Sequence, residues 1–159
     1  MRWISLRKKK ELLSDPQTPQ EVVDRLYEAS EEAEIRLLAA KRGLSRDAWR
    51  RAVARENSWY VIKALLEKAD EDGLRYFYEV RPDLRGAIPA VKGVAVPDDL
   101  VEALIEDPNE DTRAEAIFRF ADREWVARRA FERGERAVLL ARFQRFGGEL
   151  LARLLAEDP

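Results

Sequence analysis

A repeat of 25 or 26 residues is the feature of this sequence that most constrains its fold. Self-similarity at such a period predicts stacked repeats, because each unit alone would leave one apolar face exposed. Six segments align when they start near residues 18, 44, 70, 96, 121 and 146. The fifth residue of each segment is apolar: Val22, Ala48, Leu74, Leu100, Trp125 and Leu150. Four residues later an apolar side chain recurs in five of six segments: Leu26, Ala52, Tyr78, Leu104 and Leu154, with Arg129 as the exception.

Apolar pairs at i and i+4 indicate one face of an α-helix, so the first half of each segment is predicted to be helical. The second half has its own column, in which four of five members are Ala, and this favours a second, closely packed helical element. In the third segment Gly86, Pro89 and Gly93 predict a short 3₁₀ turn or a broken helix instead. We expect one all-α domain over residues 1–159, with residues 1–17 as an N-terminal cap. The column is Leu38, Ala64, Ala90, Ala116 and Ala141.

Two stretches, DPQTPQEVV at 15–23 and LIEDP at 104–108, carry an Asp-Pro step beside an apolar helix face. They resemble the unit starts of the leucine-rich repeat variant family, and the resemblance covers roughly residues 12–159. It implies a right-handed α-solenoid of alternating α and 3₁₀ helices, with a general binding role and no catalytic residues. The units here are longer than is usual in that family, which favours two α-helices per unit, as in HEAT-like repeats. The choice between α and 3₁₀ for the second element stays open.

The residue types that are missing exclude several kinds of chemistry. The chain has no Cys and no His, which excludes disulfides, thiolate or imidazole metal sites, and Cys–His or Ser–His catalysis. No carboxylate pair or Gly-rich loop stands in a catalytic context, so we expect no enzyme activity and no cofactor. No signal peptide and no apolar run of membrane-spanning length is recognised, so the expected location is the cytoplasm. Abundant Arg with scarce Asn and Met suggests a thermophilic source.

Arginines recur at the eighth position of four segments, as Arg25, Arg51, Arg128 and Arg153. An acid stands four residues before each of them, and this spacing favours intrahelical salt bridges. The alternative is a basic ridge that follows phosphates. A denser local patch is predicted where Arg42, Arg46, Arg50, Arg51 and Arg55 follow one another.

Aromatic side chains and charge segregation complete the candidate surface. Trp59 and Phe77 belong to aromatic clusters, and Phe77 takes the place of the arginine at the eighth position. An exposed aromatic there would suit a binding hot spot, whereas a buried one would fill the interface between repeats. Residues 69–112 have a net charge of −8 from 4 basic and 12 acidic residues, between net basic ends. A partner of complementary charge, or self-association, would suit this pattern.

The function predicted from these observations is a non-catalytic scaffold that binds a protein partner through one face of the solenoid. The alternative is nucleic-acid binding through the Arg-rich patch, against which the chain's formal net charge of −2 argues. The candidate binding surface comprises Arg42, Arg46, Arg50, Arg51, Arg55, Trp59 and Phe77.

Overall fold

The computed structural model describes residues 4–157, and the regular secondary structure in that range is helical. The described residues contain α-helices, one 3₁₀ turn and no β-strand, so the predicted all-α class is confirmed. Residues 1–3 of the predicted N-terminal cap lie outside the described range. The rest of that segment forms α1 (Leu6–Ser14) and the turn that follows it.

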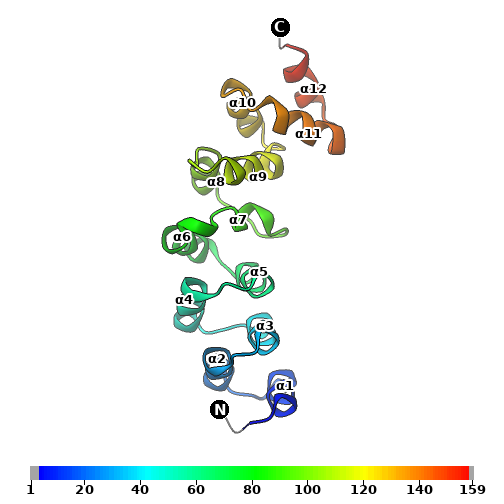
Figure 1. Cartoon of the computed structure of the whole chain (residues 1–159). Coiled ribbons are helices and arrows are strands. Elements are labelled where there is room, and N and C mark those ends of the chain that lie inside the picture. The colour runs from blue at the N-terminus through cyan, green and yellow to red at the C-terminus, as the bar shows by residue number, and fades with distance from the viewer. Residues whose placement is uncertain (1–3, 158–159) are drawn as a thin grey trace. The chain divides into compact units, whose positions relative to one another are not determined.

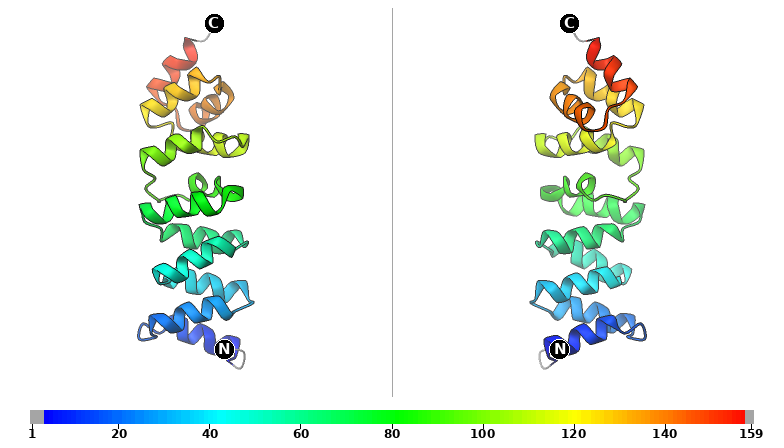
Figure 2. Two further views of the ribbon diagram at one scale, coloured as in Figure 1. Left: turned by 90° about the vertical axis from the view of Figure 1, so that its left-hand side faces the viewer. Right: turned by 90° about the vertical axis from the view of Figure 1, so that its right-hand side faces the viewer.

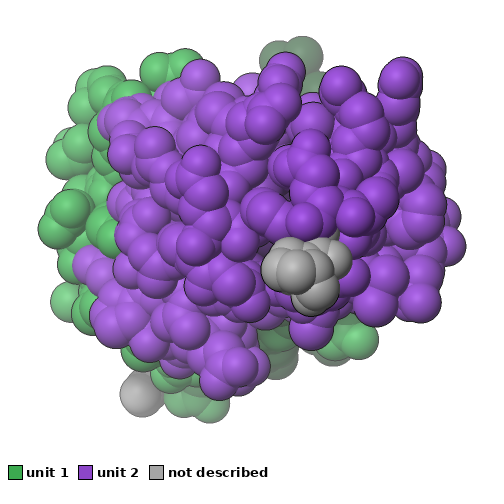
Figure 3. Space-filling view, turned by 90° about the horizontal axis from the view of Figure 1, so that it is seen from above, with its two compact units in different colours: residues 1–83 green, residues 84–159 purple. Residues whose placement is uncertain are grey.

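The chain divides into two compact units, residues 1–83 and residues 84–159 (Figure 3). In the first unit, alternate helices stack on one another in two rows (Figure 1). One row consists of α1, α3 and α5, and the other of α2, α4 and α6, and Figure 2 shows these helices stacked in sequence order from blue to green. The remaining helices of this unit are α2 (Gln20–Ala29), α3 (Ala33–Arg42), α4 (Arg46–Arg55), α5 (Trp59–Glu67) and α6 (Glu71–Val80).

Local sequence explains where these helices begin and which face they bury. The Ser5 and Asp70 side chains accept hydrogen bonds from backbone N–H groups in the first turns of α1 and α6, which would otherwise lack partners. Helix α2 buries Val23, Leu26 and Tyr27, which the 3.6-residue period places on one face. Full burial of an aliphatic side chain such as Leu26 contributes about 1.5–3 kcal/mol, and stacking between rows is the source of that burial.

The second unit repeats the two-row arrangement. Helices α7, α9 and α11 contact one another in order, as do α8, α10 and α12. A 3₁₀ turn, η1 (Pro82–Leu84), contains the boundary between the units. The helices of the second unit are α7 (Ala87–Ala90), α8 (Asp98–Ile105), α9 (Glu110–Phe120), α10 (Glu124–Glu132), α11 (Arg136–Phe146) and α12 (Glu149–Ala156).

The break predicted in the third segment is present. Instead of one regular helix the chain forms η1, the four-residue α7 and an irregular stretch that leads to α8. Backbone carbonyls in this region lack intrahelical hydrogen-bond donors, and the Arg119 guanidinium of α9 donates hydrogen bonds to them instead. It donates to the oxygens of Pro89 at 3.1 Å and Val94 at 2.8 Å, and also to those of Ile88 and Val91. One charged side chain therefore stabilises a segment whose only α-helix is the four-residue α7.

Helix starts follow the repeat closely, whereas the Ala column is less regular than predicted. Each of the six predicted segment starts is followed within three residues by the first residue of α2, α4, α6, α8, α10 or α12. The other element is an α-helix in the first, second, fourth and fifth segments, namely α3, α5, α9 and α11, whereas it is broken in the third, and the described part of the sixth contains α12 alone. In the Ala column, Ala64 and Ala116 are buried, but Ala90 and Ala141 are exposed. Ala90 ends the short α7 and Ala141 lies within α11, and their exposure means that neither is enclosed by a neighbouring helix.

None of the helices in residues 4–157 is long and apolar enough to cross a lipid bilayer.

Candidate functional site

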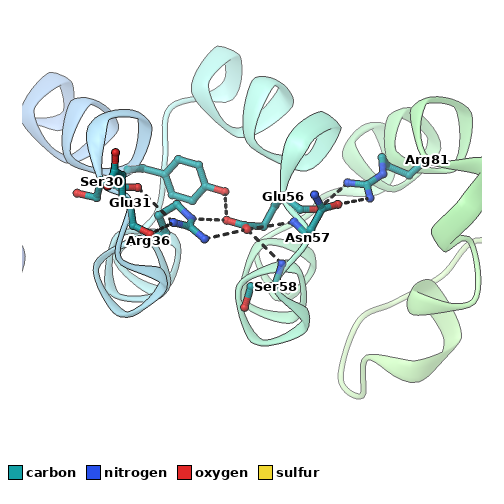
Figure 4. A network of polar contacts seen from close by, with 8 residues as sticks. Ser30, Glu31, Arg36, Glu56, Asn57, Ser58 and Arg81 are labelled. Carbon is teal, nitrogen blue, oxygen red and sulfur yellow. Dashed lines mark hydrogen bonds and ion pairs between the residues drawn. The ribbon is translucent and has the colours of Figure 1, made fainter.

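Glu56 is the centre of a polar network in the first unit (Figure 4). Its side chain is only 4% exposed, yet it carries a carboxylate. Oε1 accepts from the Tyr27 hydroxyl at 2.6 Å and from Arg36 Nε at 2.9 Å. Oε2 accepts from the backbone N–H groups of Asn57 at 3.1 Å and Ser58 at 3.2 Å, and from Arg36 Nη2 at 3.4 Å. The buried charge is thus paired and hydrogen-bonded on both oxygens, as its burial requires.

The position of Glu56 in the chain explains this arrangement. It is the residue directly after α4, and only two residues separate it from the start of α5. The Ser58 side chain forms no capping bond, so the Glu56 carboxylate binds the N–H groups that precede α5 instead. A negative charge is favoured there by the helix dipole. Arg36 is held in place by its own bonds to the carbonyls of Ser30 and Glu31, in the turn between α2 and α3.

The network shifts the proton affinity of its members. Burial raises the pKa of Glu56, but hydrogen bonds from Arg36, Tyr27 and the Ser58 N–H outweigh it, and the net pKa is lowered. Burial and the bond to Glu56 raise the pKa of the Tyr27 hydroxyl well above its usual range. The bond to Glu56 also raises the pKa of Arg36. At neutral pH Glu56 is therefore an anion, and Tyr27 keeps its proton.

Arg81, the residue after α6, extends the network to a further helix. Its Nη1 donates to the carbonyl oxygens of Val53 at 3.1 Å and Glu56 at 2.6 Å. Its Nη2 donates to Asn57 Oδ1 and to the Asp83 carboxylate, both at 3.2 Å. Arg81 thereby satisfies carbonyls at the C-terminus of α4, where a cation is favoured. The polar network links α2 through α6 along one edge of the first unit.

A pocket of about 490 Å³ opens beside this network. Its walls combine charged groups with the Tyr27 ring and the Ala52 methyl group. They come from the ends of α2 and α4, the start of α3 and the turn into α5. The lining residues are Tyr27, Glu28, Arg36, Arg51, Ala52, Arg55, Glu56, Asn57 and Ser58.

Not all polar groups of the pocket are engaged by the protein. Arg51 forms an ion pair with Glu28 at 2.6 Å, and Arg36 and Glu56 are paired with each other. Asn57 uses its Oδ1 to accept from Arg81, which leaves the donors of its amide group. Among residues 4–157, no ion pair or hydrogen bond engages the Arg55 guanidinium, the Asn57 Nδ2 or the Ser58 hydroxyl. The pocket therefore offers unused donors, which suit a ligand that accepts hydrogen bonds.

The five arginines of the predicted patch lie in three different environments. Arg42 donates to the carbonyls of Leu13, Asp15 and Thr18, and so anchors the end of α1. Arg46 and Arg50 line a second pocket of about 340 Å³, which also contains Trp49, and Arg50 lies over the Tyr76 ring at 4.7 Å. Arg51 and Arg55 line the first pocket. The structure brings together only these last two with the Glu56 network.

The salt bridges predicted within single helices form in one case. Arg128 pairs with Glu124 at 2.9 Å, as the i, i+4 spacing predicts. Arg51 pairs instead with Glu28 on the neighbouring α2. Within the described residues, Arg25 and Arg153 have no carboxylate within ion-pair distance. The arginines at the eighth position therefore form no uniform ridge.

The two aromatic candidates differ in their exposure to solvent. Phe77 is fully buried, with 0% exposure, so it fills the interface between helices and is removed from the candidate surface. Trp59 is 42% exposed, and its neighbour Tyr60 is 72% exposed. Both stand in the first turn of α5, directly after Ser58 of the pocket wall. The first turn of α5 therefore presents aromatic area next in sequence to the unused donors.

Sequence reasoning missed Tyr27, Arg36, Glu56, Asn57 and Ser58. The repeat contains one signal that could have found Glu56: it stands at the thirteenth position of its segment, as Ser30 does, and Arg81 stands at the twelfth position of the next segment. All three are buried polar residues that directly follow the first helix of their segment. A polar column at a helix end predicts capping contacts between neighbouring units.

No protein-family model, curated protein or solved structure matches the chain. Within the described residues, no group of three or more Asp, Glu, Cys or His side chains is placed to hold a metal ion. The fold and the site define a class of protein: an all-α protein of stacked helices whose first unit contains a polar pocket, with exposed aromatic residues next in sequence to the pocket wall.

Proposed function

We propose that this chain is a non-catalytic protein-binding scaffold, and that it uses the pocket and the first turn of α5 to hold a protein partner. The observation that carries the proposal is the succession of unused donors and exposed aromatics between residues 55 and 60. Arg, Trp and Tyr are the side chains most enriched at energetic hot spots of interfaces. We call the surface formed by Arg55, Asn57, Ser58, Trp59 and Tyr60 the α5 entry surface.

The proposed architecture is a right-handed α-solenoid of six helix–turn–helix repeats, similar to leucine-rich repeat variant and HEAT-like proteins. Two observations support it: alternate helices form two rows in each unit, and a helix follows each predicted segment start. Proteins built in this way bind through extended surfaces formed by equivalent positions of successive repeats. Handedness follows from the family resemblance.

Binding suits the chemistry of the pocket better than catalysis does. Glu56 would be the natural general base, but its oxygens already accept five hydrogen bonds and its pKa is lowered. The split of the arginine patch counts against the nucleic-acid alternative, because the guanidinium of Arg42 is occupied by carbonyls and that of Arg51 by Glu28. Phosphate tracking requires several unoccupied cations along one path.

Affinity capture with matched variants tests the proposal. Wild-type protein, the double variant W59A/Y60A and the variant F146A serve as baits in a native lysate treated with nuclease. Phe146 is 60% exposed and lies in the second unit, so F146A controls for the loss of exposed aromatic area. We expect one or more proteins to be retained by wild type and F146A and reduced about tenfold or more by W59A/Y60A. Identical recovery by all three baits, or loss of every partner on nuclease treatment, would contradict the proposal.

A further inference from the structure

The arginines of the pocket have counterparts in the second unit. Arg51 and Arg55 are the sixth and tenth residues counted from the start of α4. Counted from the start of α10, the sixth and tenth residues are Arg129 and Arg133. The acids on the preceding helix of each row correspond as well. Asp24 and Glu28 are fifth and ninth from the start of α2, and Glu102 and Glu106 are fifth and ninth from the start of α8.

In the second unit both arginines have a carboxylate partner. Arg129 binds Glu102 at 2.6 Å, and Arg133 binds Glu106. Each arginine thus pairs with the acid at the corresponding place on the neighbouring helix. The bond to Glu102 raises the pKa of Arg129.

In the first unit the pairing differs, because Arg51 binds the second acid of the neighbouring helix, Glu28, and not the first, Asp24. Asp24 Oδ1 accepts hydrogen bonds from the backbone N–H of Ser45 and from Gln20 Nε2, both at 2.9 Å. The Asp24 carboxylate is therefore occupied by the residue that precedes α4 and by the first residue of α2. Arg51 forms its ion pair with Glu28, which corresponds to Glu106, the acid that Arg133 binds. Arg55 is left without a carboxylate among residues 4–157, although its counterpart Arg133 has one.

We propose that an acidic side chain of the protein partner, Asp or Glu in an extended peptide, binds in this pocket and supplies the carboxylate that Arg55 lacks. This inference rests on the proposed function. The Asn57 amide and the Ser58 hydroxyl are further donors for the second carboxylate oxygen, and the Tyr27 ring and Ala52 give the methylene groups of the acid an apolar wall. Exposed Trp59 and Tyr60 suit an apolar residue next to that acid in the peptide.

Charge complementarity favours a carboxylate over a phosphate. The pocket contains three guanidinium groups, Arg36, Arg51 and Arg55, and two carboxylates, Glu28 and Glu56, so its formal charge is +1. A carboxylate carries one negative charge, whereas a phosphomonoester carries about 1.5 to 2 at neutral pH. Only Arg55 is free to form a bidentate pair.

Selection from a displayed library of random peptides tests the inference, with the full-length wild type, R55Q, R55E and the control R25Q as targets. Arg25 is exposed and has no carboxylate partner in the described residues, so R25Q removes the same charge outside the pocket. We expect wild type and R25Q to enrich peptides with Asp or Glu at a fixed position. R55Q should weaken binding of these peptides about tenfold or more, and R55E should select Lys or Arg at that position. Melting temperatures of the variants check that folding is unchanged.

The outcomes separate the two proposals. Peptides enriched without an acidic preference, or bound equally by R55Q, would overturn the carboxylate inference and leave protein binding intact. If no peptide is enriched, NMR titration with blocked glutamate, blocked glutamine and inorganic phosphate decides on the pocket itself. Saturable shifts of the Arg55 Nε–H and Asn57 side-chain amide signals with glutamate alone would support the carboxylate site and count against peptide recognition. Equal shifts with glutamine, no shifts with any probe, or tighter binding of phosphate would overturn the inference.

Discussion

The Glu56 carboxylate gains more from its five donors than it loses by leaving water. Oε1 is shared by a neutral hydroxyl and a guanidinium, and Oε2 holds two backbone N–H groups and the same guanidinium. If one member is removed, the others remain in a site from which water is excluded. Such an uncompensated buried group lowers the free energy of unfolding by more than the lost interaction itself contributed.

The substitution Glu56→Gln should therefore lower the free energy of unfolding at pH 7 by about 2–4 kcal/mol. Because the pKa of Glu56 is lowered in the folded state, its stabilisation is present above its unfolded pKa, near 4.3, and is lost as the pH falls further. The difference between wild type and E56Q in urea denaturation should consequently shrink from pH 7 toward pH 3. Glu115→Gln, an exposed acid on α9, should change stability by no more than about 0.5 kcal/mol. A gap that stays constant across this pH range would contradict the assigned role of Glu56.

Sequence reasoning could find single residues only where a local rule decides their role. The i, i+4 rule predicted the pair Arg128–Glu124, the repeat register indicated Arg51, and the local run of arginines indicated Arg55. It could not find the contact between Tyr27 and Glu56, because these residues are 29 positions apart and meet only when α2 and α4 stack. The burial of Phe77 is likewise decided by neighbouring helices.

At the level of helices, the arginines act mainly on neighbouring elements. Arg42 of α3 binds carbonyls at the end of α1, and Arg142 of α11 binds the carbonyls of Phe118 and Arg119 at the end of α9. Helix C-termini have carbonyls without intrahelical partners, and a guanidinium supplies several donors at once. The periodic pattern therefore predicts where helices lie and where the third segment breaks. Which carbonyls a given arginine reaches depends on packing between helices, about which the pattern contains no information.

The acids of α8 form a ladder with arginines from the start and the end of α10. Asp98 pairs with Arg123 at 2.7 Å, and Glu102 and Glu106 pair with Arg129 and Arg133. This part of the predicted acidic stretch is thus neutralised within the second unit. The exposed location of the pairs means that dissolved ions screen them strongly.

The triple variant D98N/E102Q/E106Q should melt at a lower temperature than wild type at low ionic strength, and the two should converge at about 1 M NaCl. The control is E110Q/D111N/E115Q, which removes the same number of charges from α9 without breaking an ion pair of the ladder. Thermal unfolding followed by circular dichroism measures both. A difference that persists undiminished at high salt would show that the acids act through packing and not through charge.

In both units of the molecule, the principal contacts of each helix are with helices of its own unit that are next to it in sequence or one place further on. Helix α5, for example, packs on α3 and α4. In such an arrangement stability is close to a sum of local terms, so a defect should spread to its neighbours and fade with distance along the chain. Whether residues 1–159 behave as the single predicted domain is therefore a question about cooperativity.

The substitution Leu65→Ala tests whether the chain unfolds as one domain. Leu65 is fully buried in α5, and its truncation is expected to lower the free energy of unfolding by about 2–5 kcal/mol. Hydrogen exchange followed by mass spectrometry should then show faster exchange in α3 to α6 and near wild-type protection in α9 to α12. Ile117→Ala, an equally buried site in α9, should give the reverse pattern. If either variant speeds exchange equally in both units, the chain unfolds as one cooperative body and local coupling is the wrong description. If each effect stays within its own unit, the α5 entry surface can tolerate changes in the second unit.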